Sequence, residues 1–237
     1  MGPVSRLIVW VCLAGAAEAG HIRGTVVIEK KLTRRTVTAS AGAYQRGMGV
    51  DPGPPPAADP LAFERSHVAI YLEGPPTAAS GGANQIAASI AQTHREFEPD
   101  LVVIPAGSTV SFPNFDPIFH NVFSLSKPKS FDLGNYPQGE TRMVTFAKPG
   151  IVFVNCRLHP NMAASIVVSP TRWVAKADSE GRFDLSGVPA GEYTVVAWHK
   201  SAGFFRQRVT VSEQQAAEVR FLIPLLGNAT AQPAAAR

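Results

Sequence analysis

The chain has 237 residues, of which 45% are hydrophobic and 17% charged, and it contains 20 prolines and 20 glycines. A hydrophobic share of this size excludes global disorder and permits a packed core. So many prolines and glycines favour strands and turns over long helices. The formal net charge of +4 is modest. It gives no indication of a nucleic-acid partner and only weakly suggests an acidic protein partner.

The first residues have the pattern of an export signal. Arg6 gives a short basic start, and the apolar run "LIVWVCLAGAA" that follows is too short to span a bilayer comfortably. The small residues of "AEA" fit a cleavage site, so we expect a signal peptide at 1–19 and a mature chain from Gly20. The expected location is periplasmic or secreted, with no membrane span after cleavage. A membrane anchor is the alternative interpretation of this run.

Cleavage would leave Cys156 as the one cysteine of the mature chain. The sequence has two cysteines, and the other, Cys12, lies inside the apolar run. In an oxidising compartment a lone thiol has no partner for an internal disulfide. We therefore expect Cys156 to be buried, paired between chains or bound to a ligand.

The segments before residue 97 predict two strands and two loops. Strand composition marks 22–32, and alternating apolar residues predict a strand over 67–74. Small residues and prolines at 40–60 and 75–85 indicate a linker and a loop. We group 20–66 as an N-terminal strand and Pro/Gly-rich loop and begin the first domain at residue 67.

The following segments predict a series of short strands separated by turn residues, which is typical of an antiparallel sandwich or barrel. The stretch "KPKSFDLGNYPQG" at 127–139 is interpreted as a loop. The first domain is expected to span 67–170. Its later strands are predicted at 97–107, 108–115, 121–126, 141–150, 151–156 and 163–170.

After Pro170 the pattern indicates a second, smaller β-sandwich at 171–226, followed by a frayed tail at 227–237. Its two apolar stretches, 178–199 and 205–224, are interpreted as hairpin-like units. Trp173 and Trp198 are expected in its core. The predicted fold class is therefore all-β, with two successive sandwiches.

The loop "CRLHPNM" carries the most specific chemistry of the chain. Cys156, His159 and Met162 are spaced by three residues, between two predicted strands. A thiolate, an imidazole and a thioether form a soft ligand set that suits copper. A blue-copper site combines one cysteine and two histidines with a weak axial methionine, so one histidine is missing from this loop.

His120 is the best candidate for the missing ligand. It lies just before a predicted strand, where a loop leaves the sheet. The other histidines, at positions 21, 67, 94 and 199, are expected to be surface or core residues, because isolated histidines usually have no metal role.

Other interpretations of these residues predict different chemistry. A bare C-x-x-H also occurs in zinc sites, but a structural zinc site needs more cysteine and histidine ligands than this loop provides. A nucleophilic cysteine would need a base and an orienting group, and no hydrolase signature surrounds Cys156. Met162 taken alone would be a core residue.

The stretches "FPNFDPIFHNVFS" and "FDLGNYPQGETRMVTFAKPGIVFVNCRLHPNMAASIVV" resemble the cupredoxins in content and order. The ligand loop is most similar to the short loop of amicyanin. The wider chain, over roughly 67–226, resembles plastocyanin-like exported proteins labelled methylamine utilisation proteins, in which "GRFDLSGVPAGEYTVVAWH" would match a carboxypeptidase-regulatory-like sandwich. The resemblance implies a Greek-key cupredoxin sandwich followed by that second, smaller β-sandwich.

The resemblance also implies roles for individual residues. His120, Cys156 and His159 would bind one copper ion in a plane, and Met162 would be the axial ligand. Asn121 would tie the first histidine's loop to the cysteine's loop by hydrogen bonds, as outer groups orient metal ligands.

Three functions are compatible with such a chain: an exported one-electron carrier, a copper-binding or delivery protein, and a non-redox interaction module of the cell envelope. Four protein ligands would leave no open position for a substrate, so we do not expect an enzyme. A carrier needs a redox partner protein, and the net charge of +4 is compatible with an acidic one. The expected electron exit is His159, inside an apolar docking patch of Pro117, Ile118, Phe119, Leu158 and Pro160.

Overall fold

The structure is a computed structural model, and it describes residues 20–33, 59–74 and 86–224. These residues form strands almost throughout, so the predicted all-β class is confirmed. The predicted signal peptide, most of the predicted linker, the loop at 75–85 and the tail lie outside the described residues. The elements are β1 (Gly20–Ile28), α1 (Ala62–Ser66), β2 (Val68–Glu73), β3 (Ala87–Ser89), β4 (Ala91–Thr93), β5 (Glu96–Glu98), β6 (Leu101–Pro105), β7 (Ser108–Pro113), β8 (His120–Ser126), β9 (Lys129–Tyr136), β10 (Thr141–Phe146), β11 (Gly150–Asn155), β12 (Ala163–Ser169), β13 (Val174–Lys176), β14 (Arg182–Val188), β15 (Gly191–His199), β16 (Gly203–Val211) and β17 (Ala217–Ile223).

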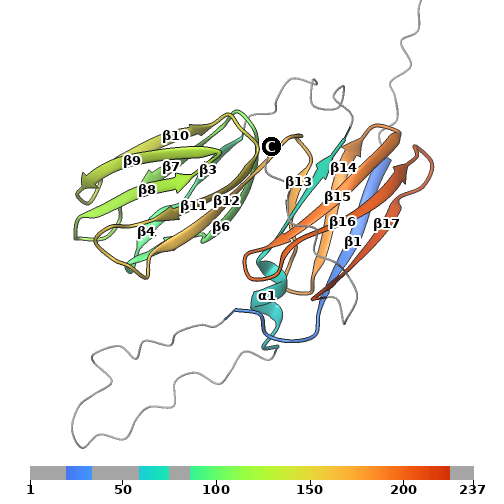
Figure 1. The fold of residues 1–237 in the computed structure, drawn as a ribbon, viewed down its shortest axis with the longest axis horizontal. Coiled ribbons are helices and arrows are strands. Elements are labelled where there is room, and N and C mark those ends of the chain that lie inside the picture. The colour runs from blue at the N-terminus through green and yellow to red at the C-terminus, as the bar shows by residue number, and fades with distance from the viewer. Residues whose placement is uncertain (1–19, 34–58, 75–85, 225–237) are drawn as a thin grey trace, which may run out of the picture.

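One sandwich is built from the middle of the chain. Its larger sheet has the strand order β6-β12-β11-β8-β9, and its smaller sheet the order β10-β7-β3. Alternating apolar residues of both sheets, such as Val110 and Phe112 of β7, point into one shared core. The hairpin of β4 and β5 lies beside this sandwich (Figure 1). We call it the middle sandwich.

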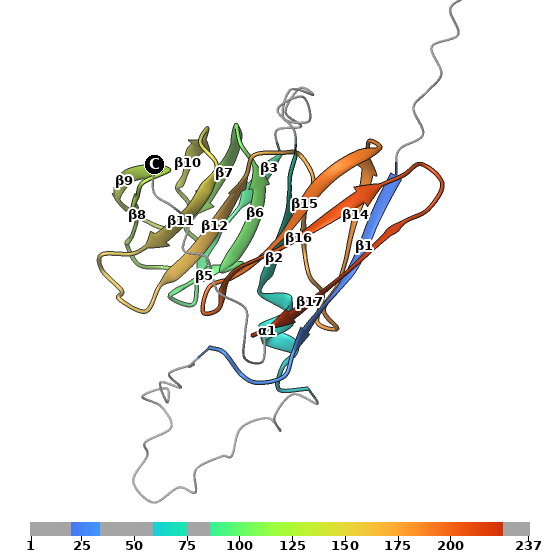
Figure 2. The same cartoon turned by 45° about the vertical axis from the view of Figure 1, so that its right-hand side comes forward.

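The other sandwich combines strands from both ends of the described chain. Its sheets have the strand orders β14-β1-β17 and β13-β2-β15-β16. A second apolar core fills the space between them. We call it the flanking sandwich, and Figure 2 shows its sheets beside the middle sandwich.

A third apolar cluster joins the two sandwiches. It contains Tyr71, Val196 and Trp198 from the flanking sandwich and Leu101 and Val167 from the middle one. The sheets with β2 and β12 therefore pack on each other, and both strands are buried on both faces. This explains why β2 carries apolar residues toward both faces: Val68, Ile70 and Leu72 lie in the core of the flanking sandwich, and Ala69 and Tyr71 lie in the cluster between the sandwiches.

The predicted domain boundaries are wrong at two strands. β2, expected in the domain at 67–170, pairs with β13 and β15. β1, expected in a separate N-terminal segment, pairs with β14 and β17. The flanking sandwich is thus not made from 171–226 alone, and the middle sandwich interrupts it. Composition identifies a strand but does not reveal a partner that lies more than one hundred residues away.

The two predicted hairpin-like units are wrong as well. β14 and β15 lie in different sheets, and so do β16 and β17. The hairpin of this region is formed by β15 and β16, which meet at the pair His199 and Gly203. Trp173 and Trp198 are buried as expected, but Trp198 lies in the cluster between the sandwiches.

The sequence prediction missed one edge strand of the middle sandwich. The expected loop at 127–139 contains β9, an edge strand whose side chains are mostly exposed or half-buried. Its alternation is diluted by Gly134, which has a positive φ of 68°. Among the described residues no helix is long and apolar enough to cross a membrane.

Candidate metal centre

The loop of residues 156–162 connects two neighbouring antiparallel strands. β11 ends at Asn155 and β12 begins at Ala163, and these two residues are paired. Inside the loop the Cys156 amide donates to the Met162 carbonyl at 3.3 Å, and the Met162 amide donates to the His159 carbonyl at 3.0 Å. The loop is therefore held closed by its own backbone between two rigid strands.

β8 brings the predicted third ligand to this loop. β8 neighbours β11 in the sheet, with Phe123 opposite Asn155. His120, the first residue of β8, is fully buried and lies near the end of β11 from which the loop departs. Cys156 and His159 follow His120 by 36 and 39 positions in the sequence. Strand pairing brings the three residues to one point.

Three of the predicted ligands form one compact group. The ligand atoms of His120, Cys156 and His159 all lie within 4.8 Å of one another. The two Nδ1 atoms are 3.0 Å apart, and Cys156 Sγ is 3.8 Å from His159 Nδ1. Over the part of the chain that the structure describes, this is the one group of at least three metal-binding side chains.

These separations fit a single soft metal ion. Two nitrogens about 2.0 Å from one ion are about 2.8 to 3.5 Å apart when the angle between them is about 90 to 120°. A sulfur about 2.3 Å from the ion then lies about 3.7 Å from each nitrogen. One thiol and two imidazoles are a donor set that suits copper. The residues present therefore fit the implied ion.

Asp116 orients His120 for this role. The His120 Nε2–H donates to Asp116 Oδ2 at 2.7 Å, and both side chains are buried. A carboxylate only accepts, so the proton of a neutral imidazole lies on Nε2 and the Nδ1 lone pair faces the group. Burial alone would raise the pKa of Asp116, but hydrogen bonds from Arg95, His120 and His94 hold it below its usual value.

The two amide donors to Asp116 come from the tight turn between β4 and β5. The His94 and Arg95 amides donate to its carboxylate at 2.7 and 2.8 Å. Both residues have positive φ, 53° and 59°, which is uncommon outside glycine. Sequence reasoning missed Asp116, because nothing in the motif around His120 marks a carboxylate four residues earlier as its partner.

His159 differs from His120 in its exposure to solvent. Its side chain is partly exposed, whereas His120 is fully buried. Partial burial, the neighbouring His120 and the charge of Arg95 lower the pKa of His159 below its ordinary value. A neutral ring with a free Nδ1 is the form that binds a metal.

Cys156 is buried and accepts a backbone hydrogen bond. The Asn121 amide donates to its sulfur at 3.4 Å. Asn121 thus lies beside the cysteine, as the resemblance implied, but its side chain does not bond to the cysteine's loop. The side-chain amide donates instead to Asp132 Oδ1 on β9, at 2.7 Å.

Met162 lies within the same apolar core as Cys156 and is almost fully buried. This position is compatible both with the predicted axial role and with ordinary core packing. Its role as a fourth ligand therefore stays a prediction.

Several apolar residues close in sequence to the metal group are exposed. Phe119 and Leu158, two residues of the predicted patch, are 57% and 46% exposed, and Phe115, earlier in the segment before His120, is 61% exposed. Pro117 and Pro160 are also exposed, whereas Ile118 is half-buried. The predicted patch thus lies mostly on the surface and does not fill the core.

The remaining histidines have other partners. His67 Nε2 lies 2.8 Å from Asp100 Oδ1, and His199 Nε2 lies 3.2 Å from Glu64 Oε2 in a buried pair. His21 and His94 are exposed. None of the four belongs to the group of His120, Cys156 and His159.

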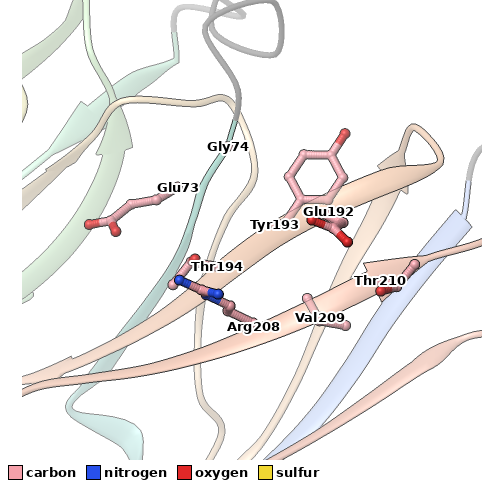
Figure 3. A pocket seen from close by; sticks show the side chains of 8 residues that line it. All are labelled: Glu73, Gly74, Glu192, Tyr193, Thr194, Arg208, Val209 and Thr210. Atoms are coloured by element: carbon pink, nitrogen blue, oxygen red, sulfur yellow. The ribbon is translucent and has the colours of Figure 1, made fainter.

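The flanking sandwich carries a separate open pocket of about 420 Å³. Figure 3 shows its lining side chains, which come from β2, β15 and β16 and from Gly74. Glu73, Glu192 and Arg208 give it mixed charge, and none of its residues is a histidine or cysteine. It offers no alternative metal site.

No protein-family model and no curated protein sequence matches the chain. Similar solved structures include the Cu-containing nitrite reductase NirK from Thermus scotoductus SA-01, with 28% identity over 35% of this chain and 22% of that one, and a TM-score of 0.34. Others are a purple cupredoxin from Nitrosopumilus maritimus (24% identity, 35% of this chain, 99% of that chain, TM-score 0.32) and amicyanin from Paracoccus versutus (23%, 42%, 96%, TM-score 0.33). The chain thus spans only 22% of the nitrite reductase's length, and each likeness covers less than half of the chain itself.

Proposed function

We propose that this chain is an exported, cupredoxin-like protein that binds one copper ion and carries single electrons. The observation that supports the proposal most is the close approach of His120, Cys156 and His159. One thiol and two imidazoles can bind both Cu(I) and Cu(II), and the bound ion would supply one-electron redox chemistry. Met162 is proposed as the weak axial ligand, as in blue-copper sites.

The surroundings of the group suit a carrier. The ligand loop is closed by its own hydrogen bonds and flanked by paired strands, which favours the same ligand positions in both oxidation states. With four side chains as ligands no position would be open for a substrate, so we do not propose an enzyme. The exported location remains part of the proposal, since the predicted signal peptide lies outside the described residues.

Electron exchange is proposed to occur through the exposed edge of His159. Leu158 and Pro160 flank it in the sequence and are exposed, Phe119 precedes the neighbouring His120 and is exposed too, and Arg95 lies close enough to lower the pKa of His159. Apolar residues beside a positive charge suit a redox partner protein whose docking face carries carboxylates.

A titration with Cu(II) tests the copper site. The purified chain beginning at Gly20 should develop an intense visible charge-transfer band that saturates at one ion per chain. Cys156→Ser should not develop it, because the band requires the thiolate. If the unchanged chain takes up no copper or shows no such band, the proposal of a blue-copper-type site is wrong.

The docking face is tested by substituting two exposed leucines, one inside the proposed patch and one outside it. Leu158→Asp should slow electron exchange with an electron-donor protein, because a charge is placed in the apolar patch. It should leave the visible band unchanged. Leu125→Asp is the matched control, since Leu125 is 78% exposed at the opposite end of β8. Equal rates for both variants would contradict the proposed patch.

A further inference from the structure

A single carboxylate on β9 connects two residues that flank the proposed ligands. Asp132 Oδ1 accepts from the Asn121 side-chain amide at 2.7 Å and from the Gly134 backbone amide at 2.9 Å. Its Oδ2 accepts from Arg157 Nε at 3.1 Å and Nη2 at 3.0 Å. Asp132 therefore joins β8, β9 and the ligand loop.

Both partners are sequence neighbours of proposed ligands. Asn121 directly follows His120 and donates its backbone N–H to Cys156 Sγ. Arg157 directly follows Cys156. A displacement of Asn121 would change the hydrogen bond on the sulfur, and a displacement of Arg157 would move the first residue of the ligand loop.

The Asn121 side chain makes no hydrogen bond of its own to the ligand loop. A carboxylate only accepts, so the amide nitrogen faces Asp132 and the amide oxygen points away from it. That oxygen is buried and has no hydrogen-bond partner among the described residues. Asn121 is therefore connected to the loop in two ways, directly through its backbone N–H on Cys156 Sγ and, from its side chain, through Asp132 and Arg157.

Arg157 is itself held in one orientation. Its guanidinium lies 4.4 Å from the centre of the Phe123 ring, and Phe123 is paired with Asn155 at the end of β11. The guanidinium contacts the aromatic face and donates two hydrogen bonds to the same oxygen of Asp132, Oδ2. These restraints limit the movement of the loop's first residues.

We infer that Asp132 is a positioning residue of the metal centre. Asp132 holds the backbone N–H of Asn121 against the Cys156 sulfur, and it fixes the start of the ligand loop through Arg157. The inference rests on the proposed function where it concerns copper. It adds Asp132 and Arg157 to the connection between β8 and the ligand loop that the resemblance assigned to Asn121 alone.

The test compares Asp132→Ala with Glu73→Ala. Glu73 forms a similar two-bond ion pair with Arg206 in the flanking sandwich, at 3.3 and 3.2 Å, with comparable exposure. Asp132→Ala should lose Cu(I) and Cu(II) to a chelator about tenfold faster or more, as expected for loss of a group that orients metal ligands, and should shift the charge-transfer band. Glu73→Ala should do neither.

Two further variants separate positioning from a general loss of stability. Asp132→Asn keeps an oxygen that can accept from Asn121 but loses the ion pair with Arg157, so its copper loss should be intermediate. Arg157→Ala combined with Asp132→Ala should be little worse than Asp132→Ala alone, because both residues act in one connection. Fully additive effects of the two alanine substitutions would overturn the connection.

A measurement on the metal-free chain keeps this inference separate from the proposed function. A thiol-reactive probe should modify Cys156 several-fold faster in Asp132→Ala than in the unchanged chain or in Glu73→Ala, since the loop covering the buried thiol is loosened. If the unchanged chain binds no copper, the proposed function fails while the thiol reaction still tests Asp132. If Asp132→Ala matches Glu73→Ala in thiol reactivity, the inference is wrong.

Discussion

At the scale of single residues, Asp116 decides which nitrogen of His120 carries a proton. Its carboxylate accepts from Nε2 at 2.7 Å and is held by two turn amides, so the Nδ1 lone pair is directed to the metal group before any ion binds. Carboxylates that orient a metal-binding histidine in this way usually contribute strongly to metal affinity.

The substitution Asp116→Ala should therefore lower copper affinity by about ten- to one-hundredfold. The physical reason is that His120 loses its preferred tautomer and ring orientation. Competition with a chelator of known affinity measures the effect, and Asp184→Ala is the control, since Asp184 is an exposed partner of Arg23 in the flanking sandwich. Equal affinities of the two variants would contradict the assigned role.

The proposed ligand residues were predictable from sequence because their types and spacing carry the chemistry. Cys156, His159 and His120 come together as expected. The residues that orient them were not predictable, because Asp116 and Asp132 reach their partners through strand pairing and turn geometry. No local pattern in the sequence distinguishes such an aspartate from an ordinary surface residue.

At the scale of elements, β1 belongs to the flanking sandwich and depends on one close contact. Gly24 of β1 is paired with Phe183 of β14. A Cβ at Gly24 would lie 2.2 Å from the Phe183 ring and 2.6 Å from the backbone oxygen of Val219. Contacts this short require the ring and the neighbouring strand to shift, so glycine is needed for this pairing.

Gly24→Ala should destabilise the chain by about 1–3 kcal/mol, the usual cost of overfilling a packed site. Chemical denaturation of the metal-free chain measures the loss. The metal centre lies in the other sandwich, so the copper spectrum of the folded variant should not change. An unchanged denaturation midpoint would show that β1 is not packed as described.

The strands themselves were largely predictable, whereas their partners were not. Alternation identified 67–74 as a strand, yet β2 pairs with β15 far along the chain, where Ile70 lies opposite Ala197, 127 residues later. Edge strands such as β9 escaped prediction because their side chains are mostly solvated and their apolar pattern is weak.

At the scale of the whole molecule, an ion pair reinforces the apolar contact between the two sandwiches. His67, next to β2, meets Asp100 in the turn before β6 at 2.8 Å. Burial alone would lower the pKa of His67, but the hydrogen bond that its ring donates to the Asp100 carboxylate raises that pKa above 6.5. Burial would likewise raise the pKa of Asp100, whereas the contact with His67 lowers it below 3.8.

These shifts predict how the pair contributes to stability as pH changes. A raised histidine pKa stabilises the fold fully below pH 6.5 and stops doing so as pH rises through the folded value. A lowered carboxyl pKa stabilises it fully above pH 3.8 and stops doing so as pH falls through the folded value. The pair should therefore stabilise most between these two values.

Asp100→Asn should accordingly destabilise the chain more at pH 5 than at pH 9. Denaturant midpoints of the variant and the unchanged chain at both pH values measure the difference. Asp184→Asn provides the control, because Asp184 is exposed and lies away from the contact between the sandwiches. If Asp100→Asn lowers the denaturant midpoint equally at both pH values, the ion pair does not stabilise the fold as described.

The proposal as a whole depends on whether bound copper is cycled and retained. Voltammetry of the copper-loaded chain, followed by metal analysis of the same sample, tests this most directly. A one-electron carrier predicts one reversible wave for one ion per chain, with the copper still bound after repeated reduction and oxidation. An irreversible wave, or release of the ion on reduction, would contradict the account and favour a protein that delivers copper.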